Sequence, residues 1–394
     1  MEPALPGRIP PARLAPPRPR RTWWRGLLAL VMLYLFVCAI KMMGTGLKLI
    51  GEEHHDDVQS VLASTDNPFV GLVIGILITS IFQSSSFTSS LTVGVAATGE
   101  LTLAQAIPIV MGANIGTTVT NTLVSLGHYR NRREFRRATS CSMLHDSFNL
   151  MTVTLLMPVE LISRALLEAE GGIIYLAANS LAELFNRPID KPPPNFVKAI
   201  TAPVVDAVEW LFGSLIDLGT TWTGVLLATA AVGMLFTALV FLVRNLRALM
   251  QTRLEGLFGR FVFRYPFTGF LVGLIITVSV QSSSVTTSMI VPLVGAGMLT
   301  TVQVFPYMLG ANIGTTVTAL IAAGAAGVHI GLAVALAHLI FNLAGTAVFW
   351  PLRRIPLRIA ELYATVVARR RYVAPIYIVV TFFILPLLCI LIFG

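Results

Sequence analysis

The sequence is poor in charge and rich in apolar residues. Only 12% of its 394 residues are Asp, Glu, Lys or Arg, whereas 55% are hydrophobic. The mean hydropathy is +0.78. This composition places the chain in a lipid bilayer rather than in water, and it favours an all-α polytopic membrane protein.

Several familiar functional patterns are missing. The three cysteines, Cys38, Cys141 and Cys389, lie in or beside apolar runs without metal-ligand spacing, so we expect core residues and no disulfide. The absence of a phosphate-cradling Walker loop gives ATP-driven transport no support. No basic face interleaved with aromatic residues is present, so nucleic acid is not an expected partner.

The net charge of +9 is concentrated in arginine blocks between the apolar runs. Such blocks are typical of cytoplasmic segments of membrane proteins, and they lie at 8–25, 130–137, 244–264 and 353–371. Residues 1–22 contain mainly Pro and Arg and predict a disordered cytoplasmic tail. We therefore expect a multi-pass protein of the plasma (inner) membrane with its N-terminus in the cytoplasm.

The chain contains one stretch twice. The tetrad Gln-Ser-Ser-Ser occurs at 83–86 and again at 281–284. The nine residues at 112–120, Gly-Ala-Asn-Ile-Gly-Thr-Thr-Val-Thr, recur at 310–318 in the same register. These gapless matches indicate an internal duplication, with repeat 1 at 23–159 and repeat 2 at 223–350.

Each tetrad lies between two short apolar runs. The run from Phe69 to Phe82 has about 14 residues, or roughly 21 Å of helix, which is too short for a hydrocarbon core of ~30 Å. Two half-length segments joined by a polar tip predict a re-entrant helical hairpin. We expect hairpins at 68–98 and 266–298, with both tips near the bilayer midplane, where surrounding protein or a water-filled cavity tolerates polar backbone.

The charge bias orients the remaining segments. We expect an extracellular acidic loop at 52–57, an extracellular linker at 160–222 and a cytoplasmic basic loop at 351–372. The predicted crossings are at 23–50, 101–127, 138–159, 223–243, 301–323, 328–350 and 373–394, the last a C-terminal helix. The two repeats then have inverted topology, which is typical of secondary transporters.

The tips and the neighbouring duplicated segments offer groups for an anion. Amide and hydroxyl donors suit the oxygens of an oxyanion, and helix N-termini add oriented N–H groups. The alternative is that these hydroxyls only bond to their own helices and assist packing. The predicted substrate-binding residues are Gln83, Ser84, Ser85, Ser86, Gln281, Ser282, Ser283, Ser284, Asn114 and Asn312.

Hydroxyl, amide and carboxylate oxygens nearby are suitable ligands for sodium. Asp146 has no counterpart in repeat 2, where Leu339 takes its place, and an unpaired intramembrane carboxylate is a candidate cation ligand. The alternative is a residue in the first turn of its helix, near the interface. The predicted sodium ligands are Thr117, Thr118, Thr315, Thr316, Asp146, Asn149 and Asn342, whereas His145 and His338 are expected to pack.

At these residues the sequence resembles the type II sodium–phosphate cotransporters. The two tetrads, the two Gly-Ala-Asn-Ile-Gly-Thr-Thr segments and the stretch 134–149 are similar to its motifs, and the resemblance covers roughly residues 25–350. It implies import of inorganic phosphate driven by sodium, with the tetrads lining the substrate site and Asp146 in the sodium-coupling apparatus. A homodimer is compatible with it. The short linker and the missing C-terminal tail suggest a prokaryotic member.

The expected mechanism is alternating access, with phosphate and sodium bound between the hairpin tips and no other cofactor. No pair of buried arginines is evident to clamp phosphate, so hydroxyls, helix ends and sodium must hold it. Two alternatives stay open: a sodium-coupled carrier of another oxyanion or small carboxylate, and a non-transporting membrane regulator. An intramembrane serine hydrolase is disfavoured because no nucleophile-elbow pattern surrounds the serines, so no enzyme is expected.

Overall fold

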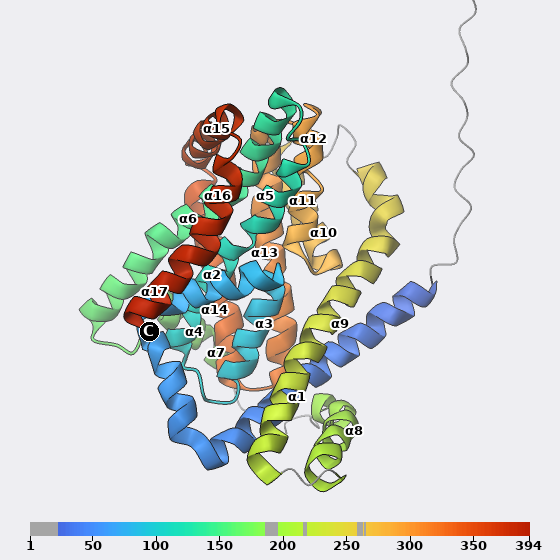
Figure 1. The fold of residues 1–394 in the computed structure, drawn as a ribbon, viewed down its shortest axis with the longest axis vertical. Coiled ribbons are helices and arrows are strands. Elements are labelled where there is room, and N and C mark those ends of the chain that lie inside the picture. The colour runs from blue at the N-terminus through green and yellow to red at the C-terminus, as the bar shows by residue number, and fades with distance from the viewer. Residues whose placement is uncertain (1–22, 186–195, 216–218, 258–262, 264) are drawn as a thin grey trace, which may run out of the picture.

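The computed structural model describes residues 23–185, 196–215, 219–257, 263 and 265–394, and the predicted tail at 1–22 lies outside this range. Throughout these segments the regular structure is helical, with no strand (Figure 1). Six helical segments are long and apolar enough to cross a membrane: Trp24–Ile50, Arg132–Leu167, Gly219–Leu246, Thr301–Ala326, His329–Phe349 and Val373–Phe393. The prediction of an all-α multi-pass membrane protein is confirmed.

The helices follow one order twice. The first set is α1 (Trp23–Ala63), α2 (Pro68–Phe82), α3 (Ser85–Ala96), α4 (Leu103–Gly116), α5 (Thr118–Leu126) and α6 (Arg132–Leu167). The second set is α9 (Gly219–Leu257), α10 (Pro266–Val280), α11 (Ser283–Ser288), α12 (Val291–Gly295), α13 (Thr301–Ala326) and α14 (His329–Phe349). Between the sets lie α7 (Ile173–Phe185) and α8 (Phe196–Trp210). The chain ends with α15 (Arg354–Arg369), α16 (Val373–Val379) and α17 (Leu385–Phe393).

Four expected segments differ in secondary structure. The acidic stretch 52–57, expected as a loop, belongs to α1, and most of the basic stretch 351–372 is helix α15. Helix α6 continues to Leu167, so it extends past the predicted start of the linker at 160. The expected crossing at 101–127 is two helices separated by Thr117. Charged residues interrupt apolar patterns without interrupting helices, which explains why charge alone misplaced three of these boundaries.

Glycines allow close packing of α2 against α4 in the first set and of α10 against α13 in the second set. A Cβ atom added at Gly112 would lie 1.9 Å from the Leu72 carbonyl oxygen, and one at Gly310 would lie 2.0 Å from the Phe270 carbonyl oxygen. Only glycine permits such a close approach of two backbones. The pairs α2–α4 and α10–α13 are therefore joined in the same way in both sets.

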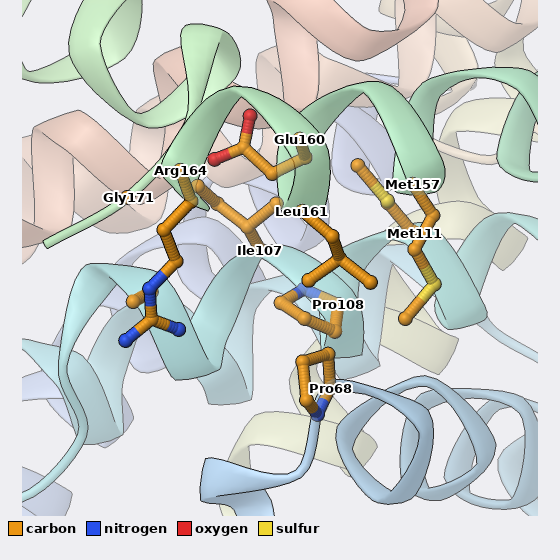
Figure 2. A pocket seen from close by; sticks show the side chains of 10 residues that line it. Pro68, Ile107, Pro108, Met111, Met157, Glu160, Leu161, Arg164 and Gly171 are labelled. Atoms are coloured by element: carbon orange, nitrogen blue, oxygen red, sulfur yellow. The ribbon is translucent and has the colours of Figure 1, made fainter. Parts of the chain in front are cut away.

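The helical pairs α2–α3 and α10–α12 have their open ends, opposite the tetrad turns, near opposite ends of α6. Pro68, at the start of α2, faces a small cavity lined also by Glu160 and Leu161 of the last turns of α6 (Figure 2). Gly297, just after α12, instead lies against Arg137 in the second turn of α6, because a Cβ added there would be 2.3 Å from the guanidinium. Figure 1 likewise shows α12 beside the upper end of α6.

Among the six long apolar segments, the two most buried belong to repeat 2. In the most apolar stretch of α13, 78% of the residues are buried within the protein, and in that of α14 the share is 61%. The C-terminal segment Val373–Phe393 has only 17% of its residues buried, so it lies at the periphery. Helices α1 and α9 lie against each other at one side of the bundle (Figure 1) and cross at Gly46 and Gly224.

Candidate functional site

Both tetrads form the same sharp turn between two helices. Gln83 and Gln281 adopt left-handed backbone conformations, with φ of 55° and 58°, and end α2 and α10. Ser84 and Ser282 then cap the next helices by accepting hydrogen bonds from the N–H groups of Phe87 and Val285. A non-glycine residue in the left-handed region is uncommon and costs free energy, and such residues cluster at functional sites.

The side chains of the two tip glutamines are fixed by equivalent contacts. The hydroxyl of Thr120 donates to Oε1 of Gln83 over 2.8 Å, and the hydroxyl of Thr318 donates to Oε1 of Gln281 over 2.8 Å. Both amide groups donate to backbone carbonyls three residues earlier. Thr120 and Thr318 belong to the duplicated nine-residue stretch, but no sequence pattern indicates that they hold the glutamines.

The two tips meet, although they are far apart in the sequence. The hydroxyl of Ser86 donates to the backbone carbonyl of Gln281 over 3.3 Å, and Thr318 donates to the Ser86 hydroxyl over 3.4 Å. The hydroxyl of Thr287 in α11 donates to Asn121 of α5 over 3.0 Å. The structure thus brings together hydroxyl, amide and carbonyl groups from both tetrads.

The remaining tetrad serines lie at the starts of the helices that follow the tips. Ser85, Ser283 and Ser284 are all buried. The Ser85 carbonyl accepts from Ser89, and the Ser283 carbonyl accepts from Thr287 over 2.8 Å. These hydrogen bonds run along α3 and α11, so the hydroxyls of Ser89 and Thr287 bond to their own helices, as the packing alternative expects.

Two histidine–asparagine pairs link the repeats. His145 of α6 contacts Oδ1 of Asn312 through Nε2 over 2.7 Å, and His338 of α14 lies 3.5 Å from Oδ1 of Asn114 through the same ring atom. Each pair joins one histidine to the asparagine of the other repeat. The expectation that the histidines pack therefore misses part of their role, which is to connect the two halves in the buried core.

The predicted asparagines form one connected set with these pairs. The amide of Asn312 donates to Oδ1 of Asn149 over 2.8 Å, and Asn149 donates to the Asn114 carbonyl over 3.0 Å. In the other repeat, Asn342 donates to the Asn312 carbonyl over 3.3 Å, while its own Oδ1 is buried without a partner. Buried unpartnered oxygens are unusual and are candidate ligands.

Asp146 is buried next to this set, with 1% of its surface exposed. Its Oδ2 accepts a hydrogen bond from the hydroxyl of Tyr377 in α16, and its Oδ1 has no partner. Thr118 is a neighbour of the same carboxyl group. Because α6 begins at Arg132, Asp146 does not lie in the first turn, and the alternative of an interfacial first-turn residue is wrong. The contact with Tyr377 had no signal in the sequence, since Tyr377 lies outside the repeats.

Three of the predicted sodium ligands bond to their own helices. The hydroxyls of Thr117 and Thr315 donate to carbonyls four residues earlier over 3.1 Å each, and Thr316 donates to Ile313 over 2.7 Å. Thr118 differs, because its hydroxyl lies 3.4 Å from Nδ1 of His145. A bonded hydroxyl keeps oxygen lone pairs that can accept or bind a cation.

Glu160, which lines the cavity in Figure 2, has a structural role. Its carboxylate accepts hydrogen bonds from the N–H groups of Gly172, Ile174 and Tyr175, over 2.8, 2.7 and 3.2 Å. These N–H groups lie at the start of α7, so Glu160 caps this helix. The cavity lies away from the tetrads and is mostly apolar in its lining.

The comparisons agree with the predicted family. The Na+/Pi-cotransporter family model matches residues 35–159 and 234–366, which together make up more than half of the chain. Sodium-dependent phosphate transport protein 2A of Rattus norvegicus is 32% identical over 428 residues, covering 91% of this chain and 66% of its own length. Sodium-dependent phosphate transport protein 2B of Homo sapiens is 30% identical over 451 residues, covering 92% of this chain and 64% of its own length.

The chain thus spans a little less than two thirds of the length of these relatives. No solved structure matches the chain at a significant level. Both tetrads and both asparagine segments lie in the region that the family model covers. The chain belongs to the Na+/Pi-cotransporter family.

Proposed function

We propose that this protein is a secondary transporter that imports inorganic phosphate together with sodium. The proposal is supported by family membership and by the names of the relatives. The observation that carries it is the contact between the two tips, where Ser86 bonds to the Gln281 carbonyl. Two duplicated polar turns that meet inside an apolar protein have a natural explanation as the two halves of one binding site.

In the proposed site, phosphate binds between the tips. The hydroxyls of Ser86 and Ser284 and the amide groups of Gln83 and Gln281 offer hydrogen-bond donors, and α3 directs its first N–H groups toward the same region. An anion with a charge near −2 is costly to bury without compensating cations. The proposed site therefore depends on sodium to complete its charge balance, which couples the two solutes.

Sodium is proposed to bind where buried oxygens have no partner. Asp146 Oδ1 and Asn342 Oδ1 are such atoms among the described residues. Asn149 lies on α6 together with Asp146, and the hydroxyl-bearing helices α5 and α13 pack against α6 and α14. They supply the hydroxyl oxygens of Thr118, Thr315 and Thr316, and Thr117 directly precedes α5. Oxygen ligands of this kind suit a small hard cation. The carboxylate supplies the formal negative charge of the site.

Alternating access is proposed to use the opposed openings of the two helical pairs. In this proposal, repeat 1 and repeat 2 are inverted in the membrane, both hairpins are re-entrant, the N-terminus and α15 are cytoplasmic, and 160–222 is extracellular. It also places the protein in the plasma (inner) membrane, and a homodimer is compatible with it. The opposed openings of the pairs along α6 support this arrangement.

Uptake of radiolabelled phosphate by proteoliposomes of the purified protein tests the proposal. We expect accumulation under an inward sodium gradient and not under an equal potassium gradient, and strong loss in Gln83→Ala and Gln281→Ala. Exposed Thr154→Val in α6 serves as a control, because its hydroxyl bonds only to the Leu150 carbonyl. Stronger competition by sulfate or a small carboxylate than by phosphate would assign another substrate, and absence of all uptake would favour a regulator.

A further inference from the structure

The C-terminal segment reaches the proposed sodium site from outside the duplicated unit. Helices α15 and α16 follow repeat 2 and lie outside the two duplicated ranges. The family model ends at residue 366, before α16 begins. We propose that Tyr377 of α16 positions the Asp146 carboxylate so that one of its oxygens stays available to bind sodium. This inference rests on the proposed function.

The two oxygens of Asp146 have different surroundings. Oδ2 accepts the hydrogen bond of the Tyr377 hydroxyl, whereas Oδ1 is buried and has no partner. The ion pairs found in the described residues join other groups, His128 to Glu134 and Arg136 to Glu361. A buried charged carboxylate without a cation is costly, so a bound cation would stabilise the charged form of this group.

Aromatic packing fixes the direction of the Tyr377 hydroxyl. The Tyr377 ring lies 5.1 Å from the Tyr363 ring and 5.7 Å from the Phe382 ring, measured between centroids, and Phe382 is fully buried. A ring held on two sides cannot follow a moving carboxylate. The carboxylate must instead keep the rotamer that reaches Tyr377, and this directs Oδ1 away from it.

The contact exists in one repeat only. The residue that corresponds to Asp146 is Leu339, which can neither bind a cation nor accept a hydrogen bond through its side chain. Tyr377 therefore supports a site that breaks the symmetry of the duplication. Because α16 supplies Tyr377 to this site, the C-terminal segment belongs to the proposed sodium-coupling apparatus.

Tyr363 provides a matched control. It is an aromatic neighbour of Tyr377, and its hydroxyl is buried without a partner. Tyr377→Phe and Tyr363→Phe each remove one hydroxyl from the same aromatic cluster, but only the first removes a hydrogen bond to Asp146. A merely structural role of the cluster would affect both variants alike.

Sodium binding is measured first without transport, as the sodium-induced rise in the Tm of the purified full-length protein, against potassium. We expect Tyr377→Phe to require about threefold to tenfold more sodium for half of the rise, and Tyr363→Phe to match the unmodified protein. In transport, the half-saturating sodium concentration should shift by the same factor. The phosphate KM at saturating sodium should stay unchanged.

An unchanged sodium requirement in Tyr377→Phe, alongside a changed one in Asp146→Asn, would overturn the inference and leave the proposed function intact. Unchanged sodium binding in Asp146→Asn would overturn both the sodium role of Asp146 and this inference. In the Asp146→Asn background, Tyr377→Phe should add little further effect, because the two residues act as one unit. Additive effects would also overturn it. Sodium binding without phosphate uptake would count against the proposed substrate alone.

Discussion

Two threonines hold the tip glutamines and therefore set the geometry of the proposed phosphate site. Thr120 donates one hydrogen bond to Gln83, whereas Thr318 donates to both Gln281 and Ser86. Replacing either threonine with valine keeps its shape and removes the hydroxyl. We expect the phosphate KM to rise about threefold to tenfold in Thr120→Val, and more in Thr318→Val, which loses two contacts.

Initial rates of sodium-driven phosphate uptake at varied phosphate concentration measure this effect. The valine variant of exposed Thr154 should keep the original KM, because that hydroxyl bonds only to its own helix. Equal phosphate KM values in all three variants would show that the threonines do not orient the tips.

The two repeat asparagines, although equivalent in sequence, should differ in their contribution to stability. Asn312 bonds to His145 over 2.7 Å and to Asn149 over 2.8 Å, whereas the Asn114 side chain makes one long contact of 3.5 Å with His338 and one bond of 3.1 Å within its helix. Asn312→Ala leaves two buried partners unpaired. We expect it to destabilise the protein by about 1–3 kcal/mol.

Thermal unfolding of the purified variants in detergent measures this difference. The Tm should fall further in Asn312→Ala than in Asn114→Ala, whose lost contact is longer. Equal falls would mean that the two cross-repeat pairs contribute equally, and the reverse order would mean that the longer pair is the stronger one.

At the scale of helices, close backbone contact joins each hairpin to the next helix. A Cβ added at Gly310 in α13 would lie 2.0 Å from the Phe270 carbonyl oxygen, which is backbone and cannot turn away. A Cβ added at Gly324 in the same helix would meet nothing within 4 Å. We expect Gly310→Ala to destabilise the protein by about 1–3 kcal/mol. Gly324→Ala should stabilise it by about 0.5–1 kcal/mol.

The Tm and the yield of monodisperse protein distinguish these alanine variants. Both substitutions lie in α13 and add one methyl group, so helix propensity is matched. Similar Tm values for the two would contradict the close packing of α10 on α13.

The duplication made much of the helix plan predictable. The helical pairs α2–α3 and α10–α12 occupy the ranges expected from the short apolar runs on either side of each tetrad. The break at Thr117 was not predictable, because the equivalent segment in repeat 2, with the same nine residues, is the continuous helix α13. Identical local sequences with different helix continuity show that tertiary contacts, rather than local propensity, decide it.

The composition of the candidate site was predictable, but its connections were not. Sequence repetition identifies Gln83, Gln281, Asn114 and Asn312 as special residues. It does not reveal that each histidine contacts the asparagine of the other repeat, since this depends on how two distant segments pack. Tyr377 carries no repeat signal at all, and only the position of α16 brings it to Asp146.

At the scale of the whole molecule, two of the basic segments lie side by side. Arg136, near the start of α6, pairs with Glu361 in the middle of α15 at 3.2 Å, and Arg371 donates to the Tyr129 carbonyl over 2.7 Å. Exposed pairs of this kind contribute little stability. Their importance is positional, because they bring the blocks 130–137 and 353–371 together, as expected for two segments on the cytoplasmic side.

The proposed inversion of the repeats predicts opposite sides of the membrane for two equivalent turns. Glu100 and Met298 follow Gly99 and Gly297, which share a left-handed conformation with φ of 88° and 78°. We expect a membrane-impermeant maleimide applied to intact cells to label Glu100→Cys and not Met298→Cys, in a background whose three cysteines are replaced by alanine. The side chain of Met298 is 72% exposed, so Met298→Cys should react once the cells are permeabilised. Labelling of both from outside would mean that the two repeats have the same orientation, and the proposed alternating access through inverted repeats would then be wrong.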